Sequence, residues 1–192
     1  MNRLAFVIAV WVLLGLELGV KDVVTIRLPA SGPGLSPSIL VPFGMFICLG
    51  AKPRVGIIAC LIIGLLMDLT FIMPMSTTPP RTFVMIGPYA LGMALGAQLA
   101  ISMRDMLIIR NPLSVAFLSV CASLVMHVVV VAIFSMHRIY GDPIHFDTFS
   151  ELFQRALASL YTGIFGFLLA YILYPLAPTL GLNLGPRSSR RG

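Results

Sequence analysis

Long runs of residues with almost no charge divide this chain, and they constrain its fold more than any other feature. Several runs of about 17 to 25 residues can cross a hydrocarbon core roughly 30 Å thick as helices that rise 1.5 Å per residue. Only 10% of the 192 residues are charged, whereas soluble domains carry about 25%. The sequence therefore predicts an all-α fold, a polytopic membrane protein built as a bundle of six transmembrane helices.

The six predicted spans belong to a single integral membrane domain. They cover residues 4–20, 35–51, 55–74, 83–103, 112–136 and 152–177, and residues 178–192 follow as a basic tail. Pro112 suits the first turn of the fifth span, where its missing N–H costs nothing. Thr148 and Glu151 form a capping-box pattern just before the sixth span, and Pro175 and Pro178 predict where that span ends.

Basic residues beside the spans predict the orientation of the chain. With a cytoplasmic N-terminus, eight of them lie on the cytoplasmic side: Arg3, Lys52, Arg54, Arg104, Arg110, Arg187, Arg190 and Arg191. The other side receives Lys21, Arg27, Arg81, Arg138 and Arg155. Because Lys and Arg are enriched in cytoplasmic loops, we expect both termini in the cytoplasm. Basic residues scattered in this way do not form a nucleic-acid-binding surface.

The sequence contains no recognisable catalytic, metal-binding or cofactor-binding motif. It lacks GxSxG, HExxH and P-loop patterns, each of which places reactive groups at a spacing that its chemistry needs. Cys48, Cys60 and Cys121 all fall inside apolar runs without a CxxC pair. We interpret them as small buried residues. We expect no enzymatic activity, no catalytic residues, no metal and no cofactor.

Asp68 is the most informative residue, because it lies within the third predicted span. An Asp at the centre of a membrane helix costs about 2.5 to 3.5 kcal/mol, which the apolar residues around it outweigh. Gly56, Cys60 and Gly64 precede Asp68 at intervals of four, so all four residues follow one side of the helix. Small residues in line allow another helix to approach closely. Asp68 is thus predicted to face protein, either as an ion, proton or substrate site or, as we favour, as a polar link between helices.

Three other polar residues fall at a similar depth in the outer half of the predicted bundle. Glu17 lies near the outer end of the first span, His127 in the fifth, and Arg155 at the start of the sixth. A cation beside a buried carboxylate eases its burial. We therefore predict that Arg155 pairs with Glu17 or Asp68. We interpret His127 as a hydrogen-bonded packing residue.

Residues 37–69 contain three motifs in a characteristic order. The second span opens with Pro-Ser-Ile-Leu-Val-Pro over residues 37–42, and a basic turn, Lys-Pro-Arg-Val-Gly, follows over residues 52–56. The third span then carries a GLLxDL-like end formed by Gly64, Leu65, Leu66, Asp68 and Leu69. This order resembles the MreD family, small integral membrane subunits of the bacterial rod-shape (elongation) system, and the size, the six spans and the last span from Arg155 also fit the family. Residues 73–81 depart from it, because they lack the glycine-rich turn that family members have.

The resemblance implies a non-enzymatic membrane scaffold for cell elongation and peptidoglycan synthesis. Its expected location is the bacterial cytoplasmic (inner) membrane. The expected partners are an MreC-like membrane protein, with MreB, RodA and a penicillin-binding-protein synthase in the same assembly, in contact with the lipid bilayer and not with nucleic acid. We predict two pairs of small residues as contact faces in the first span, Ala5 with Ala9 and Gly15 with Gly19. A third predicted face, in the fourth span, joins Gly92 and Gly96 to Ala90 and Ala94.

An alternative function remains open at this point. In size and helix count the chain also resembles the substrate-capture subunits of energy-coupling-factor vitamin transporters. Those subunits dock through small residues of their first helix, and Ala5 and Ala9 offer such an AxxxA face. Trp11 is the only tryptophan, and the predicted outer loops hold few groups that would bind a vitamin.

Overall fold

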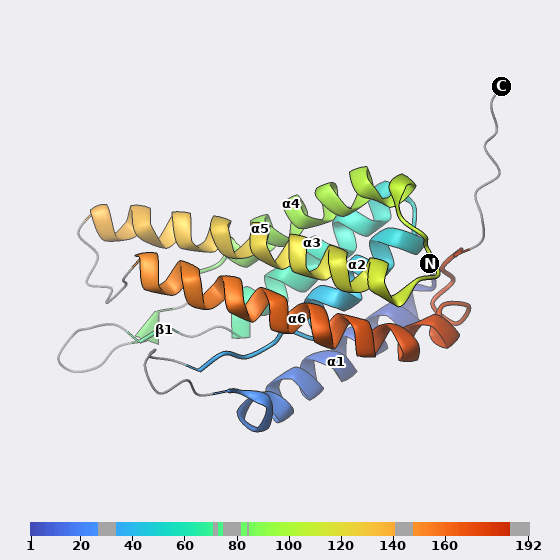
Figure 1. Ribbon diagram of the computed structural model, residues 1–192, viewed down its shortest axis with the longest axis horizontal. Coiled ribbons are helices and arrows are strands. Elements are labelled where there is room, and N and C mark those ends of the chain that lie inside the picture. The colour runs from blue at the N-terminus through green and yellow to red at the C-terminus, as the bar shows by residue number, and fades with distance from the viewer. Residues whose placement is uncertain (27–33, 71–72, 75–81, 84, 141–147, 185–192) are drawn as a thin grey trace.

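The computed structural model describes the whole chain except residues 27–33, 71–72, 75–81, 84, 141–147 and 185–192 (Figure 1). Six α-helices account for most of the described residues. In chain order they are α1 (Arg3–Val24), α2 (Leu40–Gly50), α3 (Pro53–Thr70), α4 (Pro88–Met103), α5 (Pro112–Ile139) and α6 (Thr148–Leu176). A 3₁₀ turn, η1 (Arg104–Met106), follows α4, and two short strands, β1 (Met73–Pro74) and β2 (Thr82–Phe83), pair antiparallel between α3 and α4.

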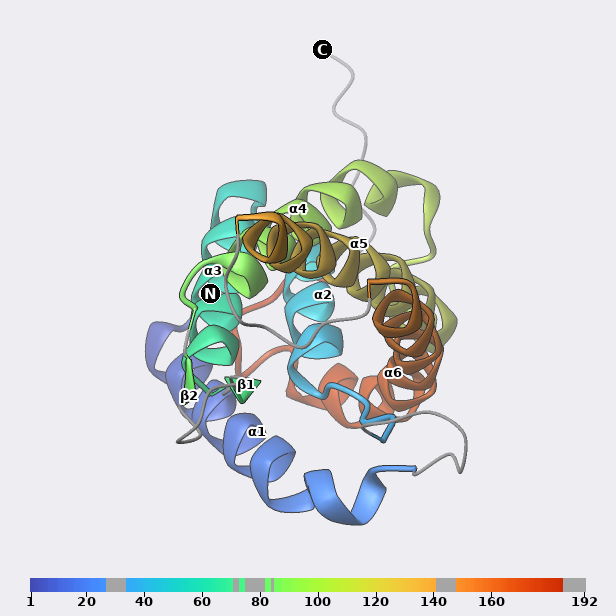
Figure 2. The same cartoon turned by 90° about the vertical axis from the view of Figure 1, so that its left-hand side faces the viewer.

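Helix α2 forms the centre of the bundle. All of its residues are buried, and the other five helices are arranged around it when the molecule is viewed along its long axis (Figure 2). An uninterrupted apolar sequence such as Leu40–Gly50 suits this position, because a helix that is apolar all round is stable only where no side faces water. Helix α1 lies at the edge of the bundle and uses Phe6, Val10 and Leu14 to contact it.

Within the described part of the chain, four helices are long and apolar enough to cross a membrane: α1, α3, α5 and α6. Helix α2 has only 11 residues, about 17 Å at 1.5 Å per residue, which is roughly half the hydrocarbon thickness. The second predicted span, residues 35–51, is therefore helical only in its later part. Helix α4 likewise begins at Pro88 rather than at residue 83. In both places non-helical chain precedes a helix that starts inside the molecule.

The remaining helix ends differ from the predicted spans by a few residues, with one larger departure in the tail. Helix α5 begins at Pro112, as the proline predicts, and α6 begins at Thr148 and continues through Pro175 to Leu176. The first residues of the predicted basic tail pack on the bundle, because Leu180, Leu182 and Leu184 are buried. The Asn183 amide also donates to the Gly50 carbonyl. The predicted basic tail, residues 178–192, therefore packs against the bundle as far as Leu184.

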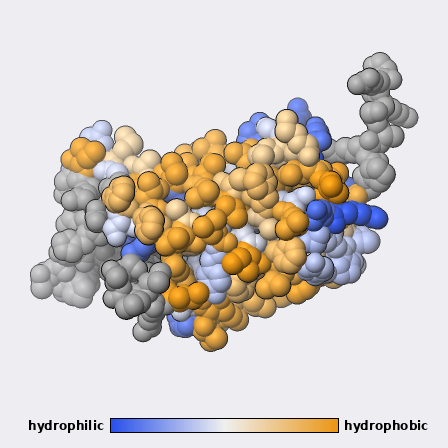
Figure 3. All heavy atoms as spheres, in the orientation of Figure 1, coloured by the Kyte–Doolittle hydropathy of each residue, from blue (hydrophilic) through white to orange (hydrophobic). Residues whose placement is uncertain are grey.

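Apolar side chains cover the middle of the visible surface, and hydrophilic side chains gather at its right-hand end (Figure 3). Trp11, Ile164 and Ile172 are each more than half exposed. Exposed apolar surface on this scale is costly in water and favourable in lipid. The fold is therefore a helical bundle whose long helices have the surface expected of a membrane protein.

Candidate functional site

Asp68 connects the end of α3 to the start of α4. Its side chain is 1% exposed, which confirms the prediction that it faces protein. Oδ2 accepts hydrogen bonds from the backbone N–H groups of Gly87 (2.9 Å) and Ala90 (3.0 Å), and Oδ1 accepts one from Tyr89 (2.9 Å). The first N–H groups of a helix have no partner within it. Asp68 therefore caps the N-terminus of α4 from a neighbouring helix.

Two glycines make this contact possible. A Cβ atom on Gly64, one turn before Asp68, would lie 2.6 Å from the Ala90 Cα and 2.6 Å from the Tyr89 carbonyl oxygen. Only a glycine at that position lets α3 lie this close to the first turn of α4. Gly87, which precedes Pro88, has φ +129°, a backbone conformation that other residues rarely adopt. The predicted close approach of a helix to this side of α3 is thus confirmed.

Glu17 makes an equivalent contact at the start of α2. Its Oε2 atom accepts hydrogen bonds from the backbone N–H groups of Ile39 (3.0 Å) and Leu40 (2.9 Å). The Ser38 hydroxyl donates to Oε1 at 3.1 Å. The Ser38 backbone N–H in turn donates to the Thr162 hydroxyl of α6 at 3.1 Å. Glu17 therefore caps α2 from α1, as Asp68 caps α4 from α3.

Capping by a carboxylate is electrostatically favourable because aligned peptide dipoles leave a partial positive charge at a helix N-terminus. That charge is not screened by water where the N-terminus is buried. Helix α6 carries its own acid, Glu151, in its first turn. Each of the three helices that run in this direction, α2, α4 and α6, thus begins beside a carboxylate.

Arg155 does not take the partner predicted for it. Its Nε atom pairs with Glu151 of the same helix at 3.1 Å, and its Nη1 atom donates to the Tyr89 hydroxyl at 3.1 Å. Glu17 and Asp68 are held instead by backbone N–H groups, which makes a side-chain cation unnecessary for their burial. The prediction that Arg155 pairs with Glu17 or Asp68 is therefore wrong. Tyr89 nevertheless links Arg155 to Asp68 indirectly, because its backbone N–H binds Asp68.

Helix α5 presents two polar atoms to the interior without a hydrogen-bond partner in the described structure, Ser123 Oγ and His127 Nδ1. The Nδ1 atom of His127 therefore lacks the hydrogen bond that the sequence interpretation assigned to this residue. Among the described residues, no three His, Cys, Asp or Glu side chains lie close enough to hold a metal ion together.

The small residues of α3 and α4 are used for packing within the chain. A Cβ on Gly92 would lie 2.8 Å from the Met126 Cα of α5, and one on Gly96 would lie 3.0 Å from the Ala122 Cβ. A Cβ on Gly56 would lie 3.2 Å from the Cys48 Sγ of α2. The prediction that Gly92 and Gly96 form a contact face for another protein is therefore wrong, because α5 covers this face.

The predicted faces of α1 have different surroundings. Ala5 and Ala9 pack partly against the core. Gly15 and Gly19 are exposed, and a Cβ at either would meet nothing within 4 Å. Of the small-residue pairs predicted as contact faces, the pair of Gly15 and Gly19 is thus the one that stays open.

The cysteines agree with their interpretation as packing residues. All three are free thiols, Cys48 and Cys60 are buried, and Cys121 is partly buried. Cys48 of α2 and Cys60 of α3 lie with their Sγ atoms 3.5 Å apart, and this contact closes the α2–α3 interface.

Sequence reasoning missed Ser38 and Tyr89. Ser38 carried a usable signal, since a serine shortly before an apolar run is a preferred N-cap residue. The Gly87–Pro88 step was a second signal, because proline favours the first turn of a helix. Neither signal shows that the capping carboxylate comes from another helix.

Comparison of the chain with models of protein families, with curated proteins and with solved structures found no match.

Proposed function

We propose that this chain is a non-enzymatic integral membrane subunit that acts as a scaffold in a bacterial cell-elongation complex. The observation that carries the proposal is the bonding of Asp68. Both of its oxygens accept backbone N–H groups of α4. An acid that transfers protons or binds substrate needs an oxygen directed at that partner. Asp68 contributes to the fold instead, and Glu17 does the same.

The residues that carry the resemblance to the MreD family are those that build these two helix starts. Residues 37–42 lead into α2, where Ser38 and Leu40 contact Glu17. Gly64 and Asp68 belong to the GLLxDL-like end of α3 and position α4. This supports a shared architecture in which the motif has a structural purpose. The partners we propose are those of the resemblance, an MreC-like protein first, with MreB, RodA and a penicillin-binding-protein synthase.

The transporter alternative has less support. Its docking face would include Ala5 and Ala9, and both pack partly against the core of this chain. We therefore do not propose a substrate-capture function.

We further propose that the chain lies in the bacterial cytoplasmic membrane with both termini in the cytoplasm. Arg3, Lys52, Arg54 and Arg110, which the positive-inside rule places there, are all exposed. A cysteine introduced at Ser36 should react with an impermeant maleimide added outside intact cells. One introduced at Ser188 should react only after the cells are opened. The reverse pattern would contradict this orientation.

Recovery of an MreC-like partner tests the function. Gly15→Leu and Gly19→Leu place large side chains on the exposed side of α1, where membrane helices associate through close packing. We expect the Gly15→Leu/Gly19→Leu variant to recover about tenfold less partner in mild detergent, equivalent to about 1.4 kcal/mol of binding free energy. Rod shape should also be lost on depletion of the protein in a walled bacterium.

The control for that experiment is Ala132→Leu, which also places a leucine at an exposed position of an apolar helix, α5, and should leave partner recovery unchanged. A purified protein that carries a tightly bound vitamin-sized ligand, in cells whose shape does not depend on it, would contradict the scaffold proposal.

A further inference from the structure

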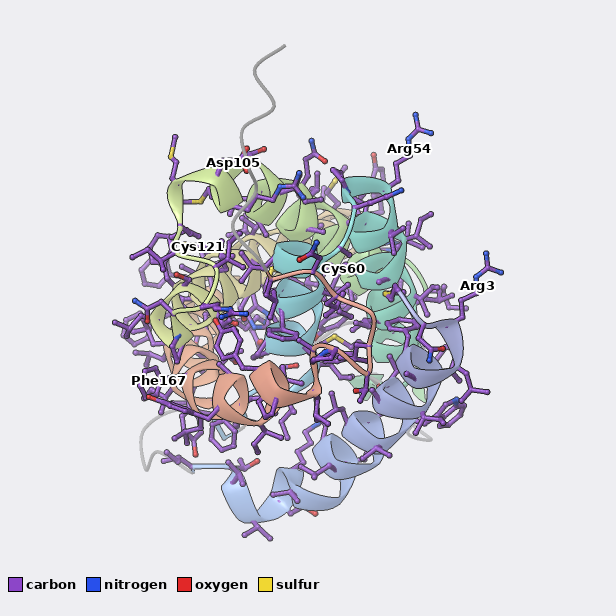
Figure 4. The ribbon with its side chains drawn as sticks, turned by 90° about the vertical axis from the view of Figure 1, so that its right-hand side faces the viewer. Arg3, Arg54, Cys60, Asp105, Cys121 and Phe167 are labelled. Carbon is purple, nitrogen blue, oxygen red and sulfur yellow. The ribbon has the colours of Figure 1, made fainter. Side chains whose placement is uncertain are left out.

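Exposed cations gather at the end of the bundle from which α1, α3 and α5 start, here called the basic end. It carries four exposed cations, Arg3, Lys52, Arg54 and Arg110. Figure 4 views the molecule from this end, and Arg3 and Arg54 extend outward from different helices. Arg104 belongs to the same end, since its Nη1 atom donates to the Ala51 carbonyl beside Lys52.

The described residues supply little negative charge at the basic end. The acid there is Asp105, which is 80% exposed and lies 3.8 Å from Arg104. Within the described part of the chain, no ion pair joins Arg3, Lys52, Arg54 or Arg110 to a carboxylate. Exposed charges of one sign in this number attract a partner of the opposite sign.

The dipoles of α1, α3 and α5 add to the positive charge of the basic end, because their N-termini lie there. None of α1, α3 and α5 has an acidic residue in its first turn. Each has a cation there or just before it: Arg3 begins α1, Lys52 and Arg54 flank the start of α3, and Arg110 precedes α5. A cation at a helix N-terminus opposes the dipole. The three helices that run the other way have Glu17, Asp68 and Glu151 at their starts.

We infer that the basic end is a binding surface for anionic phospholipid headgroups, which supply the negative charge that the protein provides at the other helix starts. The inference rests on the proposal that the chain is embedded in a membrane. A lipid is the occupant that fits, because the cations lie at the ends of helices whose sides are apolar, where headgroup phosphates are concentrated. One headgroup layer can reach all three helix starts, since they lie at the same end of the bundle.

The test compares lipids retained by the intact purified protein. The protein is reconstituted into bilayers of phosphatidylcholine and phosphatidylglycerol, released, and examined by native mass spectrometry. We expect wild-type protein to retain phosphatidylglycerol in preference to phosphatidylcholine. The variant Lys52→Gln/Arg54→Gln should lose this preference by about fivefold for each cation removed. Both side chains are exposed, so the fold should be unaffected, and circular dichroism checks this.

Lys21→Gln is the matched control, because Lys21 is an exposed cation in the last turn of α1, away from the basic end. It should retain the wild-type lipid preference. Equal retention of the two lipids by wild-type protein, or an equal loss in the control, would overturn the inference. So would displacement of the lipid by inorganic phosphate, which would assign the surface to a free anion. Protein that cannot be reconstituted would overturn the membrane proposal itself.

Discussion

Replacement of Asp68 by leucine should lower the free energy of unfolding by about 3 to 5 kcal/mol, because the N–H groups of Gly87, Tyr89 and Ala90 at the start of α4 lose their acceptor and each buried one costs about 1 to 3 kcal/mol. The helix should still insert, since the change makes α3 more apolar. Asp68→Asn should cost less, about 1 to 2 kcal/mol, because the remaining amide oxygen can still accept the bonds now made by Oδ2. Denaturant titration in mild detergent, followed by circular dichroism, measures both changes.

Asp105→Asn is the control for Asp68. Asp105 is 80% exposed and lies 3.8 Å from Arg104, so its neutralisation should change stability by less than about 0.5 kcal/mol. Equal stability of wild type and Asp68→Leu would contradict the capping role of this carboxylate.

Addition of one methyl group at Gly64 should be almost as damaging. A Cβ there meets backbone atoms of Tyr89 and Ala90 at 2.6 Å, and backbone cannot move aside as a flexible side chain can. Separation of α3 from α4 would also lengthen the hydrogen bonds of Asp68. We expect Gly64→Ala to cost about 3 kcal/mol, at the upper end of the usual range for overpacking. The same denaturant titration measures it.

Gly15→Ala provides the matched comparison, because it is the same substitution in another apolar helix, at a position where a Cβ meets nothing within 4 Å. Alanine is the better helix former by about 1 kcal/mol, so this variant should be as stable as wild type or slightly more stable. A similar loss from Gly15→Ala and Gly64→Ala would show that the α3–α4 approach is not what makes Gly64 necessary.

The sequence predicted the helical class, the number of helices and the burial of Asp68, because apolar runs and a spacing of four follow directly from helix geometry. It did not predict that α2 and α4 begin inside the molecule. Residues 35–39 and 83–87 carry no charged side chain, and hydropathy alone does not distinguish helix from loop in such a segment. The helix starts depend on carboxylates that come from other helices.

The same limit explains the two predictions about contacts that failed. The pairing of Arg155 with Glu17 or Asp68 was predicted from their similar depth in the membrane, but depth does not show where a residue lies around the bundle. Arg155 instead pairs with Glu151, one turn earlier on its own helix. Gly92 and Gly96 have the spacing of an association face, and the sequence does not show whether the associating helix belongs to the same chain. Here it is α5.

Together these observations describe a bundle in which the acids of the apolar helices hold two short helices in place. Such an arrangement explains why Glu17 and Asp68 are tolerated in apolar helices without the ion pair to Arg155 that the sequence predicted. It also separates the residues that maintain the fold from those that it leaves exposed, Gly15 and Gly19 on α1 and the cations of the basic end.

Hydrogen exchange of the protein in lipid nanodiscs tests the central claim most directly, which is that each carboxylate caps one helix. Exchange of backbone amides reports opening of the hydrogen bonds at each helix start. Asp68→Leu should speed exchange in the first turn of α4 and leave the first turn of α2 protected. Glu17→Leu should do the opposite. Unchanged protection of both helix starts in variants that have lost function would contradict the account and assign Glu17 and Asp68 to chemistry.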